Sequence, residues 1–210
     1  MGRPAKDSEG PNAVERMEDA FWECLRKTPF EKITVRDIVE RAGVNRNSYY
    51  YHFGGMWDLA ESSVHDTMML EFAHMLLDER LTAKQLMDGI SSMRDAPARF
   101  GKLRLLAGPN GNQRLLGIAR DAIVGEWLRM YGIAEADLNE STMAVIEFVF
   151  GGVAALWASN QFADVERLVH AVTHSGLVAH NLEALRQELA AIQREAERQG
   201  KPTAPTPAPA

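Results

Sequence analysis

A short segment near the N-terminus gathers side chains suited to contact a nucleic acid. Residues 46–52 read RNSYYYH, so a guanidinium, an amide and a hydroxyl precede three tyrosines and a histidine. Three neighbouring tyrosines are unusual on a buried short helix, because each hydroxyl needs a hydrogen-bond partner. Against DNA the hydroxyls can donate to phosphates while the rings pack on sugars. The segment therefore indicates nucleic-acid binding.

Other reactive residues form less specific patterns. Glu166, His170 and His174 recur every fourth residue, a spacing at which helical side chains can share a zinc ion, but a partly exposed helix face is the simpler interpretation. Cys24 is the only cysteine, which excludes a disulfide framework and a multi-cysteine zinc site. The sequence contains no phosphate-cradling glycine loop and no nucleophile beside an evident base. We therefore expect no enzyme activity, no cofactor and no metal.

Two short helices joined by a tight turn must position the segment. Thr34 is a suitable N-cap for a helix that ends near Gly43, and Gly43 can adopt the left-handed conformation of a tight turn. The next helix is predicted from Asn45 to about Phe53. A preceding helix begins at Asn12, where a glutamate three residues later gives the spacing of a capping box.

Helical periodicity continues through the rest of the chain, and strand patterns are nearly missing. The further predicted helices cover residues 56–80, 82–93, 98–106, 113–131, 137–160 and 164–198. The sequence therefore predicts an all-α fold of about nine helices. Residues 1–11 are expected to form a flexible arm and residues 200–210, rich in Pro, Ala and Thr, a disordered tail.

Charge gives no general argument for DNA binding. The chain carries a formal net charge of -6, and residues 1–60 hold nine Lys or Arg against ten Asp or Glu. A strongly basic domain is absent, so the case rests on the motif. The most apolar stretch, residues 143–158, is short and contains Glu147 and two glycines. No membrane span is expected, and a cytoplasmic location follows.

The motif resembles the TetR family of transcriptional regulators. The stretch ITVRDIVERAGVNRNSYYYHF, residues 33–53, is similar to the family's capped helix, Ala-Gly-Val turn and recognition helix ending in aromatic residues. The preceding PFEK and the following Asp58-Leu59 also fit. FVFGGVAALWA, residues 148–158, is similar to one of the family's dimerisation helices. The resemblance implies a three-helix helix-turn-helix DNA-binding domain over residues 12–55 and a helical ligand-binding and dimerisation domain over residues 56–199.

The resemblance also implies roles for individual residues. Thr34 would lie beside a phosphate, Arg36 would reach a base edge, and residues 46–48 would enter the major groove. Tyr50 and Tyr51 match phosphate-contacting aromatic residues. The implied DNA-binding residues are Thr34, Arg36, Arg46, Asn47, Ser48, Tyr50, Tyr51 and His52. One departure is Met56, where the family usually has a lysine that contacts a phosphate.

For the larger domain, the resemblance implies a small-molecule pocket and a homodimer interface. Few buried charge partners are evident, so the expected effector is apolar or aromatic. The candidate ligand-binding residues are Phe72, Trp127 and Phe148. Apolar residues around Gly151-Gly152, among them Val149 and Trp157, are predicted to form the dimer interface with the last helix. The whole would be a ligand-responsive regulator, a repressor, whose homodimer binds a near-palindromic operator in double-stranded DNA.

Two other classes of protein remain open. The acidic balance and Met56 are compatible with a helical protein-interaction module that no longer binds DNA. Such a module would show no salt-dependent DNA binding, whereas the affinity of a regulator falls steeply with salt. A small helical enzyme is the other alternative, and turnover of a ligand would reveal it.

Overall fold

The computed structural model describes residues 12–68, 70–78, 83–159 and 165–200. Within these ranges the chain is all-α, as predicted, with eleven α-helices, two short 3-10 helices and no strand. The helices form two compact units, residues 1–66 and 67–210. The predicted arm, and the predicted tail beyond Gly200, lie outside the described residues.

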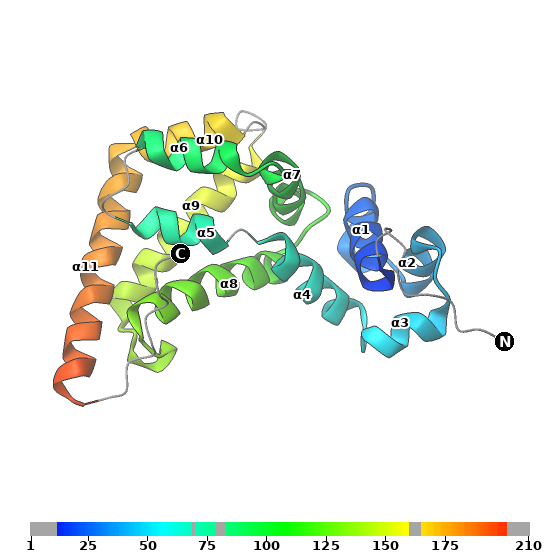
Figure 1. The fold of residues 1–210 in the computed structure, drawn as a ribbon, viewed down its shortest axis with the longest axis horizontal. Coiled ribbons are helices and arrows are strands. Elements are labelled where there is room, and N and C mark those ends of the chain that lie inside the picture. The colour runs from blue at the N-terminus through cyan, green and yellow to red at the C-terminus, as the bar shows by residue number, and fades with distance from the viewer. Residues whose placement is uncertain (1–11, 69, 79–82, 160–164, 201–210) are drawn as a thin grey trace, which may run out of the picture. The chain divides into compact units, whose positions relative to one another are not determined.

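The first unit contains four α-helices and a single 3-10 turn (Figure 1). They are α1 (Ala13–Leu25), η1 (Phe30–Lys32), α2 (Val35–Ala42), α3 (Arg46–His52) and α4 (Met56–Thr67), which reaches the boundary between the units. The predicted capping box begins α1, because the amide of Glu15 donates to Asn12 Oδ1 at 3.0 Å and the amide of Asn12 donates to Glu15 Oε2 at 2.9 Å. Two of the amides that the first turn leaves without a helical partner are thereby satisfied.

Aromatic side chains fill the core of the first unit. Phe21 is fully buried and packs edge-on against Trp22 with ring centroids 5.0 Å apart. Burying one such side chain stabilises a fold by roughly 1.5–3 kcal/mol. The contacts group most of α4 with this unit, whereas sequence analysis began the second domain at residue 56. The reason is packing, since Trp57 on α4 lies 4.4 Å from the ring of Phe30 and Leu59 is fully buried.

The second unit contains seven α-helices. They are α5 (Leu70–Leu77), α6 (Ala83–Ser92), α7 (Ala96–Ala107), α8 (Gln113–Tyr131), α9 (Glu140–Ala158), α10 (Val165–His174) and α11 (Gly176–Arg198), with a 3-10 turn, η2 (Glu135–Asp137), before α9. Asparagines cap two of them, as Asn112 Oδ1 accepts from the amide of Leu115 and Asn139 Oδ1 from that of Thr142, both at 2.9 Å. The core lies between α5, α8, α9 and α11.

Two helices predicted to be long are interrupted, which gives eleven helices where about nine were predicted. The predicted helix 164–198 divides into α10 and α11 at Ser175, directly before Gly176, and glycine is a poor residue for a helix interior. Within the predicted helix 56–80, α4 ends at Thr67 and α5 begins at Leu70. No glycine or proline stands there, so local sequence gives no signal for this second interruption.

α9 combines high hydropathy with low burial. It has 19 residues and a mean hydropathy of 1.6 over its most apolar window, so length and composition alone would allow it to cross a membrane. Only 22% of that window is buried inside the protein. Its exposed residues include Met143, Phe148, Gly151, Gly152 and Ala155. The same features suit a helix that a second protein surface covers.

Candidate DNA-binding site and ligand pocket

A tight turn sets the angle between α2 and α3. Gly43 has a φ of 64° and a ψ of 35°, the left-handed conformation that sequence analysis assigned to it. The amide of Val44 donates to the carbonyl of Val39 at 3.1 Å, and Arg16 Nε on α1 donates to the carbonyl of Ala42 at 3.1 Å. Both bonds satisfy carbonyls at the end of α2, so the turn is fixed from two sides.

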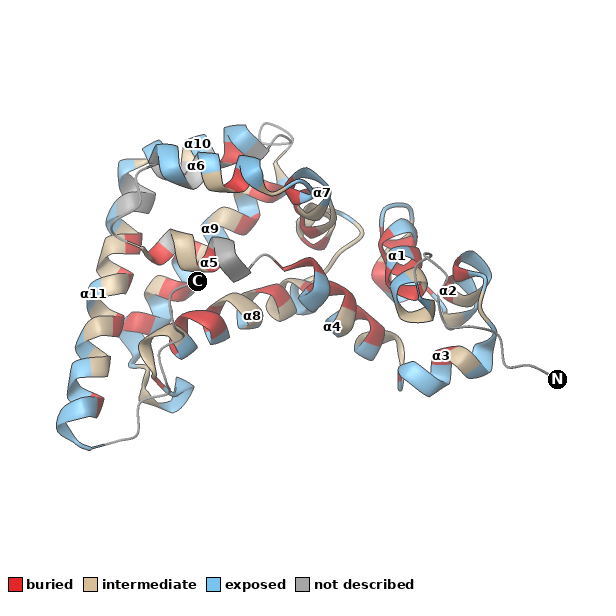
Figure 2. Ribbon diagram, in the orientation of Figure 1, coloured by how far each residue is buried: buried red, intermediate tan, exposed pale blue. Residues whose placement is uncertain are grey.

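α3 separates its three tyrosines between the core and the surface. Asn45 caps the helix by accepting from the amide of Ser48 at 2.7 Å. Tyr49 is then fully buried, Tyr50 is 50% exposed and Tyr51 is 84% exposed. Successive residues of an α-helix point about 100° apart, so a single inward tyrosine orients the other two outward. Figure 2 shows that most of α3 is exposed.

The exposed side of α3 carries an ordered cation. The guanidinium carbon of Arg46 lies 5.6 Å from the ring centroid of Tyr50, and Arg46 Nη2 donates to the Tyr50 hydroxyl at 3.4 Å. A cation held over an aromatic face loses less freedom when it meets a phosphate or a base. Asn47 is exposed beside it. Arginine, amide and two phenols thus share one short helix.

The start of α2 is capped by its own side chains. The amide of Thr34 donates to Asp37 Oδ2 at 2.8 Å, and the amide of Asp37 donates to Thr34 Oγ1 at 3.3 Å. The Thr34 hydroxyl also donates to Asp37 Oδ2 at 2.7 Å, and this bond, followed by that from the Thr34 amide, holds the pKa of the Asp37 carboxyl below its usual range. The Asp37 carboxylate therefore already occupies part of the helix N-terminus that the resemblance assigns to a phosphate. The backbone amides of Val35 and Arg36 take no part in this capping box between Thr34 and Asp37.

Arg36 is exposed but paired within the helix. Its Nε lies 2.6 Å from Glu40 Oε1 one turn later, and this hydrogen bond raises the pKa of the guanidinium. To reach a base edge, Arg36 must exchange Glu40 for the base. The sequence contains a signal for this ion pair, because Arg36 and Glu40 are four residues apart and so lie on the same side of a helix. It also contains a signal for the cap of α2, because Thr34 and Asp37 have the spacing of a capping box.

The structure thus places the implied DNA-binding residues on two consecutive helices of the motif. Thr34 and Arg36 lie at the start of α2, and the others lie on α3. Ser48 is half-buried and its amide serves the cap, while His52 is exposed at the last turn with its ring 4.9 Å from that of Tyr51. The described side chains exposed on α3 are Arg46, Asn47, Tyr50, Tyr51 and His52.

A hydrophobic pocket lies within the second unit. It contains about 530 Å³ of space that no atom occupies, counting the open solvent at its mouth. Its lining residues are Met68, Ala73, Phe100, Leu103, Ile123, Trp127, Val149, Phe150, Val153 and Trp157. All are apolar or aromatic.

The residues that line the pocket agree only in part with the ligand-binding residues predicted from sequence. Trp127 lines it, whereas Phe148 does not, because it is 57% exposed on the other side of α9. The helical turn places Val149, Val153 and Trp157, at intervals of four, on the pocket side. Trp157 is 4% exposed within its own chain, so its assignment to a dimer interface is wrong. The side chain of Phe72 lies outside the described residues.

The other reactive pattern, on α10, does not assemble a metal site among the described residues. The rings of His170 and His174 stack with centroids 3.9 Å apart, and no described group of three or more His, Cys, Asp or Glu could hold an ion.

A buried three-helix core, a left-handed glycine turn and an exposed, arginine-bearing third helix define the class of helix-turn-helix DNA-binding proteins. Residues 19–62 match the family model of the bacterial regulatory proteins of the tetR family. The matched range covers α2, the turn and α3, so the first unit carries the DNA-binding domain of tetR-family regulators. A comparison with curated proteins found no match.

Proposed function

We propose that this regulator is a ligand-responsive repressor whose homodimer binds a near-palindromic operator. The exposed face of α3 is the observation that best supports operator binding, because Arg46 and Asn47 stand at the start of the helix where base edges are read. Tyr50 and Tyr51 follow on the same face and have the hydroxyls to donate to phosphates. The remaining residues of the implied set flank this face.

The electrostatics of the motif favour binding that depends on local contacts. Arg36 and Arg46 are exposed, but Glu40 and Asp37 lie among them. Their carboxylates weaken the attraction to DNA in general, so specific contacts must supply a larger share of the affinity. We expect weak binding to random DNA and a high ratio of operator to random affinity.

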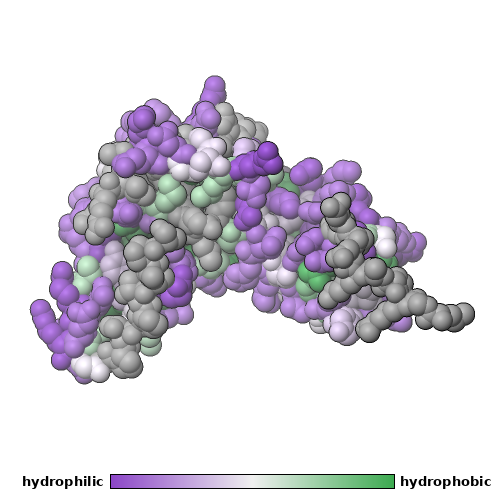
Figure 3. All heavy atoms as spheres, in the orientation of Figure 1, coloured by the Kyte–Doolittle hydropathy of each residue, from purple (hydrophilic) through white to green (hydrophobic). Residues whose placement is uncertain are grey.

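The homodimer is supported by the exposed side of α9. Phe148 and Met143 are 57% and 37% exposed, and Gly151 and Gly152 leave room for the close approach of another helix. The C-terminal end of α11 is hydrophilic on the face that Figure 3 shows, whereas Met143 and Phe148 expose apolar area on α9. A two-fold axis through such a surface would present two copies of α3 to successive major grooves.

A response to ligand is supported by α4, because this helix connects the DNA-binding motif to a residue that lines the pocket. α4 begins four residues after α3 ends, and Met68, the residue after α4, lines the pocket. A ligand that favours one position of Met68 acts on the end of α4, and through it on the motif. Only different affinities for two arrangements can drive such a change. Release of DNA on ligand binding is the expected sign.

The decisive experiment is selection of bound fragments from a random DNA pool by the purified full chain at near-physiological salt, followed by sequencing. We expect one enriched, near-palindromic motif, with an affinity that falls steeply as salt rises. If no sequence is enriched and the residual binding does not depend on salt, the chain is the protein-interaction module and the operator proposal fails.

Two variants distinguish residues that recognise the base sequence from residues that contact any DNA through its phosphates. Asn47→Ala is expected to lower the ratio of operator to random-DNA affinity roughly 5- to 150-fold, the range for one lost bidentate base contact. Tyr50→Phe is expected to weaken binding to both DNAs alike, because a phosphate contact carries no sequence information. Lys84→Glu, which changes an exposed charge on α6 in the second unit, is the control and should alter neither.

A further inference from the structure

The outward side of α3 consists of two rows of side chains. Tyr49 is fully buried, and each further residue turns the side chain by about 100° around the helix. Asn47 and Tyr51 therefore point most directly away from the core, and Arg46 and Tyr50 form a neighbouring row on the same side. In agreement with this order, Tyr51 is the most exposed of the three tyrosines.

Each row combines a residue that can recognise a base, in the first turn, with a tyrosine one turn later. The first-turn residues are Arg46 and Asn47, and both are exposed. The first turn of a recognition helix is the part that meets base edges in the major groove. An arginine pairs with O6 and N7 of guanine through two hydrogen bonds, and an asparagine pairs with N6 and N7 of adenine in the same way.

Arg46 is held for such a contact by Tyr50. Its guanidinium carbon lies 5.6 Å from the ring centroid of Tyr50, and its Nη2 donates to the Tyr50 hydroxyl at 3.4 Å. The ring is uncharged and the hydroxyl occupies only one of the N–H groups, so the guanidinium keeps its charge and most of its donors for DNA. The hydroxyl that accepts from Arg46 still has its own proton to donate to a phosphate.

The other exposed arginine of the motif is less suited to guanine. Arg36 Nε lies 2.6 Å from Glu40 Oε1, and a base must displace this carboxylate before the guanidinium can pair with it. A carboxylate close to the base edge is also repelled by O6 and N7 of guanine, which are both acceptors. These contacts favour Arg46 over Arg36 as the residue that recognises guanine.

We propose that Arg46, positioned by Tyr50, recognises a guanine and that Asn47 recognises an adenine in each half of the operator. This rests on the proposed operator binding and names the bases that α3 contacts. The two bases are expected within about three base pairs of each other, because consecutive Cα atoms are about 3.8 Å apart and base pairs rise by about 3.4 Å.

Selection from a random DNA pool, repeated with variants of the full chain, tests the assignment base by base. Arg46→Ala should lose the preference for one guanine in each half-site, and Asn47→Ala the preference for one adenine, while the preferences at other positions persist. Competition with duplexes that carry a single substituted base should show discrimination at the affected position falling roughly 5- to 150-fold, the range for one bidentate contact.

Arg46→Gln is a test that general weakening of binding cannot imitate. Glutamine pairs with adenine as asparagine does, so this variant should exchange the preferred guanine for an adenine at the same position. Arg36→Ala should keep the guanine there. Lys84→Glu, on the exposed surface of α6, is the control and should select the parent motif.

Two variants of Tyr50 test its positioning role. Tyr50→Phe keeps the ring beside the guanidinium and should keep the guanine preference, although it loses the hydroxyl. Tyr50→Leu removes the ring and should lower discrimination for guanine about two- to fivefold, the value of a cation–π contact at an exposed site. The adenine preference should persist in both variants, because Asn47 lies in the other row.

The outcomes distinguish the base assignment from operator binding itself. A guanine preference that survives in Arg46→Ala or Arg46→Gln, or that is lost in Arg36→Ala, would overturn the role of Arg46. An adenine preference that survives in Asn47→Ala would overturn that of Asn47, and unchanged guanine discrimination in Tyr50→Leu that of Tyr50. In each of these cases the enriched motif leaves the operator proposal standing. If the parent enriches no motif, both proposals fail together.

Discussion

Tyr49 is fully buried in the first unit, yet its hydroxyl has no hydrogen-bond partner among the described residues. A buried hydroxyl without a partner costs about 1–3 kcal/mol of stability. The ring itself packs against Phe53, with centroids 5.7 Å apart. The aromatic ring of Tyr49 therefore stabilises the folded motif, whereas its hydroxyl destabilises it.

We predict that Tyr49→Phe leaves the free energy of unfolding at pH 7 unchanged or raises it by about 1 kcal/mol. Burial raises the pKa of Tyr49 to about 12, whereas an exposed tyrosine in the unfolded chain titrates near 10. The folded state thus holds its proton after the unfolded state has released it. The resulting stability is complete below about pH 10 and is lost as pH rises toward 12, by up to roughly 2–3 kcal/mol.

Urea unfolding of the parent and of Tyr49→Phe at several pH values from 7 to 11 measures both effects. The advantage of the variant should widen as the solution becomes alkaline, since phenylalanine does not titrate. A variant that is less stable than the parent by more than about 1 kcal/mol at pH 7 would mean that the hydroxyl makes a stabilising bond.

Met56, the first residue of α4, is half-buried and stands where the TetR family usually has a phosphate-binding lysine. We predict that Met56→Lys tightens DNA binding and steepens the plot of log affinity against log salt by about one unit, because one more phosphate is neutralised. Fluorescence anisotropy over a salt series measures the slope. Met56→Gln, polar but uncharged, is the control, and an unchanged slope in the lysine variant would place position 56 away from the DNA.

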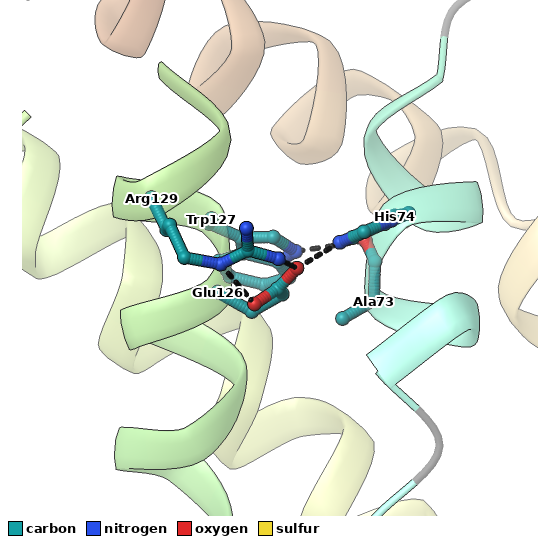
Figure 4. A network of polar contacts seen from close by, with 5 residues as sticks. All are labelled: Ala73, His74, Glu126, Trp127 and Arg129. Carbon is teal, nitrogen blue, oxygen red and sulfur yellow. Dashed lines mark hydrogen bonds and ion pairs between the residues drawn. The ribbon is translucent and has the colours of Figure 1, made fainter. Parts of the chain in front are cut away.

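At the scale of elements, a polar cluster joins α5 to α8. Glu126 on α8 is 6% exposed and accepts from Arg129 Nε at 2.9 Å, and its carboxylate also contacts His74 Nε2 on α5 (Figure 4). The hydrogen bonds from Arg129, and then the contact with His74, hold the pKa of Glu126 below its usual range. A buried carboxylate is tolerated here because it is paired.

We predict that Glu126→Gln lowers the free energy of unfolding at pH 7 by about 1–2 kcal/mol, the value of a charge-assisted hydrogen bond. Because the folded pKa is depressed, this stability is present above the ordinary carboxyl pKa of 4.5 and is lost as pH falls below it. The parent and the variant should therefore converge in acid.

Thermal unfolding of the two proteins between pH 3 and pH 7 tests the prediction. Glu135→Gln, which changes an exposed acid on η2, is the control and should follow the parent throughout. A Glu126→Gln variant that is as stable as its parent at pH 7 would show that the ion pairs only offset the cost of burying the carboxylate.

At the scale of the whole molecule, the exposed side of α9, which carries Met143 and Phe148, is the surface that we propose for the dimer interface. We predict that Phe148→Glu yields monomers at concentrations where the parent is dimeric, since a carboxylate would be buried in the proposed two-fold interface without a partner. Static light scattering behind size exclusion measures the mass. Lys84→Glu is the control for changing an exposed charge, and a Phe148→Glu dimer would exclude this face as the interface.

Local rules account for the part of the chain that was predicted well. The capping box at Asn12, the N-cap at Thr34 and the left-handed Gly43 each depend on residues within a few positions of one another. Such signals are complete within the segment itself. The inward position of Tyr49 follows from the same helical period. These are the features that specify the DNA-binding motif.

What the sequence by itself determined is therefore the helix-turn-helix, its turn and its exposed face. Only the tertiary structure decided which side of α9 is buried: Phe148 lies outside, while Trp157 turns inward to the pocket. α9 is apolar on nearly all sides, so its own period cannot choose a face. The buried side of α9 is decided by the helices that pack against it. Residues of α7 and α8 line the pocket together with α9, and residues of α11 lie in the same hydrophobic core as those of α9. Burial is set by such distant partners, and a single segment does not contain them.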